Sequence, residues 1–168
     1  VQGNGQTELI DAITGFIDNY EGDVSINGKL FSSKEGVSQR RKEGLAHIPE
    51  DRQTRGAALD ATLLQNFVMA NLDETEDQNH WAINWKKQSG IAKQYLEDFK
   101  VKFDTISTPA YSLSGGNMQK AIVAREMAMK PKVMIVAQPS RGVDIGATIF
   151  IHEKLLEKRK EGVGILLI

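Results

Sequence analysis

The chain has 168 residues, of which 40% are hydrophobic and 26% are charged, a composition typical of one globular domain of ordinary size. Its formal net charge of −1 excludes a broad cationic surface of the kind that draws nucleic acid or anionic lipid, so we expect no nucleic-acid partner. The absence of cysteine excludes a disulfide framework and thiolate metal sites. The longest apolar stretches, 133–137 and 164–168, are much shorter than the roughly 20 residues of a membrane-spanning helix.

Both ends of the chain indicate a piece of a longer protein. The first residue is Val1 rather than methionine, no charged and apolar leader follows it, and residues 164–168 resemble a buried strand that stops. We therefore expect a domain fragment that is truncated at both ends, with neighbouring motifs outside it.

The first part of the chain predicts alternating helices and strands. Apolar residues at helical spacing follow a glycine-bearing loop and continue as far as Gly15, which favours a helix end. The Asn27-Gly28 pair lies beside alternating apolar and polar residues and predicts a hairpin turn. The expected elements are a helix over 7–15, a hairpin over 22–30, a short helix over 38–43 and a strand over 45–48 that ends at Pro49.

The middle of the chain is expected to be mainly helical. Residues 85–102 carry apolar side chains at helical spacing amid lysines and acids, which predicts a long amphipathic helix. The expected segments are a charged loop over 51–56, a helix over 63–72, an acidic connector over 73–77 and the helix over 85–102. A further helix is expected to begin in the SGGNMQ sequence after Leu113 and to run to about Lys130.

The last part predicts strand, helix and strand, which favours a parallel crossover. Residues 132–137 form a β-branched run typical of a strand covered on both faces, and we expect residues 164–168 to form another buried strand. The helix over 145–160 is expected to bury Ile149, Ile151, Leu155 and Leu156. The fold class is therefore α/β with a parallel sheet: residues 1–168 form one domain, in which 1–50 and 131–168 make the core and 51–130 a helical subdomain.

Residues 3–7 partly match the phosphate-binding loop G-x-x-x-x-G-K-[ST], whose first glycine would fall just before Val1. Gln6 occupies the lysine position, and a neutral donor forms hydrogen bonds to phosphate that are about half as strong as charge-assisted ones. An ordinary strand-to-helix turn explains the same glycines equally well. The candidate nucleotide-binding residues are Gly3, Asn4, Gly5, Gln6, Thr7 and Glu8. Thr7 is also a candidate magnesium ligand.

A second candidate site is the LSGGNMQ segment at 113–119. Ser114 can cap the following helix, while Gly115 and Gly116 let backbone N–H groups approach an anion closely. Taken alone, the segment could be no more than a capped helix start. It resembles the signature sequence of ATP-binding-cassette ATPases, and the resemblance implies that Ser114, Gly115 and Gly116 bind ATP held by an opposing domain.

Two further segments support this resemblance over the whole chain. Residues 133–140 align with the family's apolar strand and its Asp-Glu-Pro-Thr sequence, and 141–144, ending in the candidate binding residue Asp144, resemble the loop after it. Ala137 stands where the family has a magnesium-supporting aspartate, and Gln138 where it has the glutamate that polarises water. The resemblance implies a P-loop NTPase (RecA-like) core, and the substitutions imply negligible hydrolysis at this chain's own loop.

Residues 46–52 resemble the glutamine loop of the same family, with Glu50 in place of glutamine. The segment resembles that of the carboxy-terminal cassette in tandem ATPases that drive import of monosaccharides or nucleosides, and the Ala-Gln-Pro variant favours the nucleoside branch. The alternative for Glu50, Asp51 and Arg52 is a solvated charged loop.

The resemblance implies a peripheral protein at the cytoplasmic face of the membrane, with ATP and Mg²⁺ as cofactors, magnesium being weakly held here. Its implied partners are a second ATPase cassette and integral membrane permease subunits. Three functions stay open: a non-hydrolytic half that completes the partner's ATP site, a fully active ATPase cassette, and a structural interaction module that binds no nucleotide.

Overall fold

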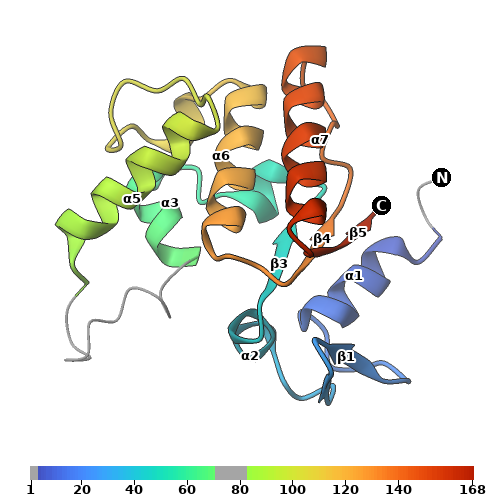
Figure 1. The fold of residues 1–168 in the computed structure, drawn as a ribbon. Helices are drawn as coiled ribbons and strands as arrows, with labels where there is room; N and C mark the ends of the chain where they lie inside the picture. The colour runs from blue at the N-terminus through green and yellow to red at the C-terminus, as the bar shows by residue number, and fades with distance from the viewer. Residues whose placement is uncertain (1–3, 71–82) are drawn as a thin grey trace.

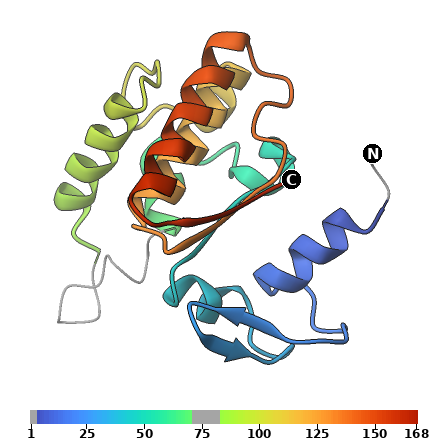
Figure 2. The same cartoon turned by 45° about the vertical axis from the view of Figure 1, so that its right-hand side comes forward.

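The computed structural model describes residues 4–70 and 83–168, which form a parallel sheet with helices on both faces (Figures 1 and 2). Gly3 and the predicted connector over 73–77 lie outside the described residues. The first elements are α1 (Gln6–Thr14), β1 (Val24–Ile26), β2 (Lys29–Phe31), α2 (Val37–Lys42), β3 (Leu45–Ile48) and the π-helical turn η1 (Arg52–Gly56). The others are α3 (Leu63–Ala70), α5 (Trp85–Asp98), the 3-10 turn η2 (Ala110–Ser112), α6 (Gly115–Ala128), β4 (Val133–Val136), α7 (Ile145–Lys160) and β5 (Gly164–Leu167).

The main sheet has the strand order β3-β4-β5, and both of its pairings are parallel. β1 and β2 form a separate antiparallel hairpin, whose turn at Asn27 and Gly28 has φ angles of 53° and 81°. The predicted parallel sheet and hairpin are therefore confirmed.

The central strand β4 contributes to two apolar cores. Met134 and Val136 are buried on one face with residues of α6 and α7. Ile135 and Ala137 are buried on the other face, in a second cluster that contains Ile10 of α1. Alternating side chains of a strand point to opposite faces of the sheet, so the β-branched run is covered on both sides, as predicted.

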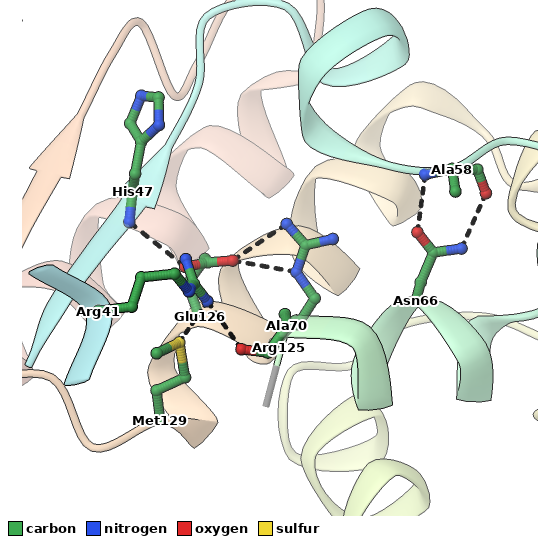
Figure 3. A network of polar contacts seen from close by, with 8 residues as sticks. All are labelled: Arg41, His47, Ala58, Asn66, Ala70, Arg125, Glu126 and Met129. Atoms are coloured by element: carbon green, nitrogen blue, oxygen red, sulfur yellow. Dashed lines mark hydrogen bonds and ion pairs between the residues drawn. The ribbon is translucent and has the colours of Figure 1, made fainter. Parts of the chain in front are cut away.

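Helices α3, α5 and α6 pack against one another beside the sheet (Figure 1). The rings of Phe67 in α3 and Tyr95 in α5 lie 5.9 Å apart. Asn66 fixes the loop before α3, because its side chain accepts from the N–H of Ala58 at 2.8 Å and donates to the carbonyl of Ala58 at 2.9 Å (Figure 3). This helical group carries the LSGG segment at the start of α6.

Several sequence expectations about exposure are wrong. Ile149 and Leu156 of α7 are 54% and 51% exposed, whereas Ile151 and Leu155 are buried. The strand β5 is not buried, since Leu166 and Leu167 are 41% and 54% exposed. β5 is an edge strand among the described residues, and one face of α7 packs on the core while the other faces outward. Periodicity identifies apolar positions, but the neighbouring elements decide which of them are covered.

A buried carboxylate joins β3, α2 and α6 (Figure 3). The Glu126 side chain, 1% exposed, lies 3.0 Å from guanidinium nitrogens of both Arg41 and Arg125. It also accepts from the backbone N–H of His47 at 3.3 Å. Burial opposes the charged carboxylate, but the two arginines and these hydrogen bonds hold the pKa of Glu126 below its ordinary value.

We expect Glu126→Gln to lower the free energy of unfolding by about 3–5 kcal/mol, because the neutral amide leaves two partly buried guanidinium groups without their anion. Urea unfolding of the chain at neutral pH, followed by circular dichroism, measures this change. Glu157→Gln is the control, because Glu157 forms an exposed ion pair with Lys154 and such pairs contribute little. Equal midpoints for the two variants would contradict the prediction.

Candidate functional site

The start of α6 is a partly exposed glycine turn capped by Ser114. The Ser114 Oγ accepts from the backbone N–H of Asn117 at 3.4 Å and from its Nδ2 at 3.0 Å. Asn117 Oδ1 accepts from the N–H of Lys102 at 3.0 Å, which ties the turn to the segment after α5. Ser114 is exposed, and Gly115 and Gly116 are only partly buried. The predicted cap is confirmed, and the positive end of the α6 dipole lies at an accessible turn.

Two loops that follow β3 and β4 are tied together beside this turn. The carboxylate of Glu50 forms an ion pair with the guanidinium of Arg141. In the other direction, Arg52 donates from Nη1 to the carbonyl of Arg141 at 2.6 Å and from Nη2 to the carbonyl of Gly142 at 3.1 Å. Each loop therefore supplies a charged side chain to the other.

The segment predicted as a charged loop over 51–56 contains a π-helical turn. Asp51 caps it, because its Oδ1 accepts from the N–H groups of Gln53 at 2.9 Å and Thr54 at 3.1 Å. Hydrogen bonds from Thr54, followed by that from Gln53, hold the pKa of Asp51 below its ordinary value. The turn also contacts α1, since Arg55 lies 2.6 Å from the carboxylate of Asp11. Charged side chains of this segment therefore contact other parts of the chain. The alternative of a loop whose charges are only solvated is wrong.

Asp144 lies at the start of α7, close to the α6 turn. Its Oδ1 caps α7 by accepting from the N–H of Ala147 at 2.8 Å. A Cβ atom at Gly116 would lie 2.9 Å from Asp144 Oδ2 and 3.4 Å from the Cβ of Ala147. Glycine at position 116 thus leaves room for the Asp144 carboxylate beside the start of α6, and a Cβ atom there would force that carboxylate to shift.

A cavity of about 540 Å³ lies between the starts of α6 and α7, and its lining includes Lys100, Lys102 and Lys120. Burial lowers the pKa of Lys120, Lys102 and Lys100 add to this effect, and Asp144 opposes it. Lys120 also donates to the backbone carbonyl of Lys100. The surroundings of the α6 turn are thus rich in cationic groups.

The start of α1 has a different character. Gly5 precedes the helix in the left-handed conformation, with φ 79°, and no side chain caps the first turn. Asn4, Gln6 and Thr7 are exposed, and the first turn carries the acidic Glu8. A helix start attracts anions, but a carboxylate in the first turn offsets part of that attraction, and Gln6 adds no positive charge.

The end of β4 supplies no carboxylate. Ala137 is 2% exposed in the apolar cluster that contains Ile10. Gln138 adopts a left-handed conformation with φ 43°, and its N–H donates to the carbonyl of Ile168 at 2.8 Å. Magnesium is held in proteins chiefly by carboxylate oxygens, so Ala137 and Gln138 do not fit such an ion. Among residues 4–70 and 83–168, no cluster of three or more His, Cys, Asp or Glu could hold a metal.

The structure places the predicted site residues in two groups. One group surrounds the α6 turn beside Arg52, at the ends of β3 and β4, and it consists of Glu50, Ser114, Gly115, Gly116 and Asp144. The other begins α1, which packs on the opposite face of the sheet in both views (Figures 1 and 2). It consists of Asn4, Gly5, Gln6, Thr7 and Glu8, with Gly3 outside the described residues.

Sequence reasoning did not find the contacts of Arg52. They join positions 89 and 90 residues apart, and no local pattern encodes such a pairing. The signal present in the sequence is the pair of glycines, Gly115 and Gly142, which leaves space for a long side chain.

The structure has an α/β fold, with a parallel sheet, a glycine-initiated helix at its edge and helices on both faces. The chain belongs to the ABC transporter family, whose sequence profile matches residues 1–141. The family and the P-loop NTPase fold class expected from the sequence are thereby confirmed.

Curated relatives match the whole chain. It is 35% identical to the nucleoside import ATP-binding protein NupA of Lactococcus lactis subsp. cremoris and 33% identical to the ribose import ATP-binding protein RbsA of Halalkalibacterium halodurans. In both cases the match covers 100% of this chain and 33% of the relative. The chain therefore spans about a third of the length of these relatives.

Solved structures agree with this assignment. A nucleotide-free ATP-binding cassette from an ABC transporter has a TM-score of 0.78 at 25% identity, over 100% of this chain and 67% of that one. A dimeric bacterial ABC transporter cassette shares the fold, with a TM-score of 0.81 at 17% identity, over 99% of this chain and 70% of that one.

Among the described residues, no helix combines the length and apolar character that crossing a bilayer requires.

His47 lies on β3, three residues before Glu50. Its ring contacts that of Phe16 edge-on, with centroids 6.3 Å apart, and its Nε2 is buried without a hydrogen-bond partner among the described residues. Burial lowers the pKa of His47 to about 4; Glu126 opposes this change and Arg55 adds to it. The folded chain therefore favours the neutral ring well below the ordinary pKa of histidine.

Because the folded-state pKa is depressed, the contribution of His47 to stability is present above about pH 6.5 and is lost as the pH falls toward 4. Between pH 7.5 and 5, we expect the wild-type chain to lose about 2 kcal/mol of unfolding free energy more than His47→Gln. Urea unfolding at the two pH values measures the difference. His152→Gln, which removes an exposed histidine of α7, is the matched control for the substitution. Parallel losses in wild type and His47→Gln would refute the prediction.

Proposed function

We propose that this chain is a nucleotide-binding cassette of an importer for a simple sugar or a nucleoside, and that it acts as the non-hydrolytic partner of a second ATPase cassette. The names of the relatives, nucleoside import and ribose import ATP-binding proteins, support the class of transported solute. The dimeric cassette of the same fold supports pairing with a second cassette.

The observation that carries the proposal is the contrast between the two helix starts. The α6 start is capped by Ser114, contains Gly115 and Gly116 and lies beside cationic side chains. Backbone N–H groups at such a turn suit the terminal phosphate of a nucleotide. We propose that this turn completes the ATP site of the partner, where hydrolysis takes place.

The chain's own loop lacks the groups that phosphoryl transfer uses. Gln6, Ala137 and Gln138 replace a lysine and two carboxylates, and Ala137 is buried among apolar side chains. Loss of a single electrostatic group of this type lowers a catalytic rate by about 10²–10³. Hydrolysis at this loop is therefore negligible, and magnesium is held weakly there. These substitutions argue against a fully active cassette.

The segment that contains Glu50 is proposed to contact integral membrane permease subunits, with the chain at the cytoplasmic face of the membrane. The segment suits this role because Arg141 and Arg52 link it to the loop beside the α6 turn. The division into a core (1–50 and 131–168) and a helical subdomain (51–130) remains a prediction, in which α6 belongs to the helical subdomain.

In the assembled transporter, we expect Ser114→Arg to lower ATP turnover by about 10²–10³, because the bulky cation replaces the cap of the phosphate-binding turn. Gln138→Ala should change turnover by less than about twofold, since Gln138 has no role in the hydrolysing site. Steady-state phosphate release measures both.

Ser107→Arg introduces the same side chain at an exposed position of the loop before α6 and serves as the matched control. Equal losses of turnover in Ser114→Arg and Gln138→Ala would contradict the proposed division of labour.

The chain's own loop should bind ATP weakly, with nearly the same affinity in the presence of Mg²⁺ and of EDTA, because Ala137 and Gln138 at the end of β4 supply no carboxylate for the metal. Fluorescent ATP titrated into the 168-residue chain tests this expectation. A tenfold or greater loss of affinity in EDTA would support the alternative of a fully active ATPase cassette. No binding under either condition would favour the structural interaction module for this loop.

A further inference from the structure

Arg52 lies against two segments that are far from it in the sequence. It belongs to η1, and its two terminal nitrogens donate to the carbonyls of Arg141 and Gly142 at 2.6 and 3.1 Å. A Cβ atom at Gly115 would lie 3.0 Å from Arg52 Nη2 and 3.3 Å from the carbonyl of Gly142. The guanidinium thus fills the space between the loop after β4 and the first residue of α6.

Both glycines around the guanidinium leave room for it. Gly142 has φ 62°, a backbone conformation that residues with a Cβ atom rarely adopt. A Cβ atom at this position would lie 3.2 Å from Arg52 Nη2. At Gly115 the added atom would be as close to the same nitrogen, at 3.0 Å. A long planar cation and two residues without side chains therefore form one packing unit.

The position of the cation is unfavourable unless the two carbonyls hold it. A helix start carries partial positive charge, so a guanidinium beside the first turn of α6 is repelled by the helix dipole. The Nε of Arg52 is buried and has no hydrogen-bond partner among the described residues. The carbonyls of Arg141 and Gly142 supply the compensating negative dipoles. This geometry requires the two-pronged donor of arginine, which lysine does not provide.

We propose that Arg52 is a positioning residue that ties the Glu50 segment to the loop at 141–142 and to the α6 turn, so that the three move as one unit. The proposal rests on the proposed function in one respect: the turn that Arg52 positions is the one offered to the partner's nucleotide. Displacement of the permease-facing segment then changes the placement of Gly115 through the guanidinium, without any contact between Arg52 and the nucleotide.

The first test measures backbone amide exchange in the 168-residue chain, which needs no partner. Hydrogen bonds to charged groups shift local equilibria by about 10- to 100-fold, and we expect Arg52→Gln to speed exchange by that factor at 114–119 and 140–147. Arg55→Gln is the matched control: Arg55 lies in the same η1 turn but pairs with Asp11 on α1, so exchange at those two segments should keep its wild-type rate.

Two further variants separate geometry from charge. Arg52→Lys should exchange like Arg52→Gln, because lysine lacks the planar fork whose two separate nitrogens reach the carbonyls of Arg141 and Gly142. Gly115→Ala should act in the same direction by displacing the guanidinium, whereas Gly90→Ala, at a site on α5 with nothing within 4 Å of the added Cβ, should not. Wild-type exchange in Arg52→Lys, or in both Arg52→Gln and Gly115→Ala, would overturn the proposal.

The second test is ATP turnover by the assembled transporter. We expect Arg52→Gln and Arg52→Lys to lower kcat about tenfold, the effect of about 1.4 kcal/mol on a barrier, while the equilibrium affinity for ATP in the resting state stays unchanged. A purely structural defect would instead lower the amount of folded protein and leave kcat per folded molecule intact.

Unchanged kcat with faster exchange would refute the coupling between Arg52 and ATP turnover. If Ser114→Arg also had no effect, the proposed function itself would fail, and the exchange data would still decide the role of Arg52.

Discussion

Both parts of the site depend on the central strand β4. Its alternating side chains fill one core with α6 and α7 and another with α1, so the strand fixes the two layers relative to each other. Because β3 and β4 are parallel, their carboxyl ends lie at the same edge of the sheet, where the loops containing Glu50 and Arg141 meet. In α/β sheets this edge is where ligands bind. The reciprocal charged contacts between the loops follow from that topology.

The sequence was informative where the signal is local. The β-branched run at β4, the Asn27-Gly28 turn and the Ser114 cap are each specified by a few adjacent residues, and all three are present in the structure. Exposure was less predictable: Ile149 and Leu167 have the same apolar character as the buried Ile151, but their neighbours leave them uncovered. Apolar spacing reports which residues could be buried, and the arrangement of the other elements decides which are.

The candidate site shows the same limit. Glycines and a serine at 114–116 indicate a helix start suited to an anion, because the relevant N–H groups belong to those residues. The link between this turn and the Glu50 segment could not be predicted, since Arg52 finds its acceptors about 90 residues later in the chain. Long-range pairing of a charged side chain with backbone carbonyls leaves no periodic pattern. It left only two glycines, at 115 and 142, whose missing side chains make room for the guanidinium.

Charge is retained in this chain where it holds elements together and is absent where catalysis would need it. Glu126 is buried and pairs with two arginines, and Arg52 donates to two carbonyls. At the end of β4, by contrast, a methyl group lies in an apolar cluster, a position where a carboxylate would carry a desolvation penalty. The uncharged Ala137 thus favours stability of the sheet. Under the proposed function, in which the α6 turn serves another subunit, the absence of a carboxylate there is acceptable, because Arg52 and Asp144 lie against the turn and are fixed by bonds to residues 141, 142 and 147.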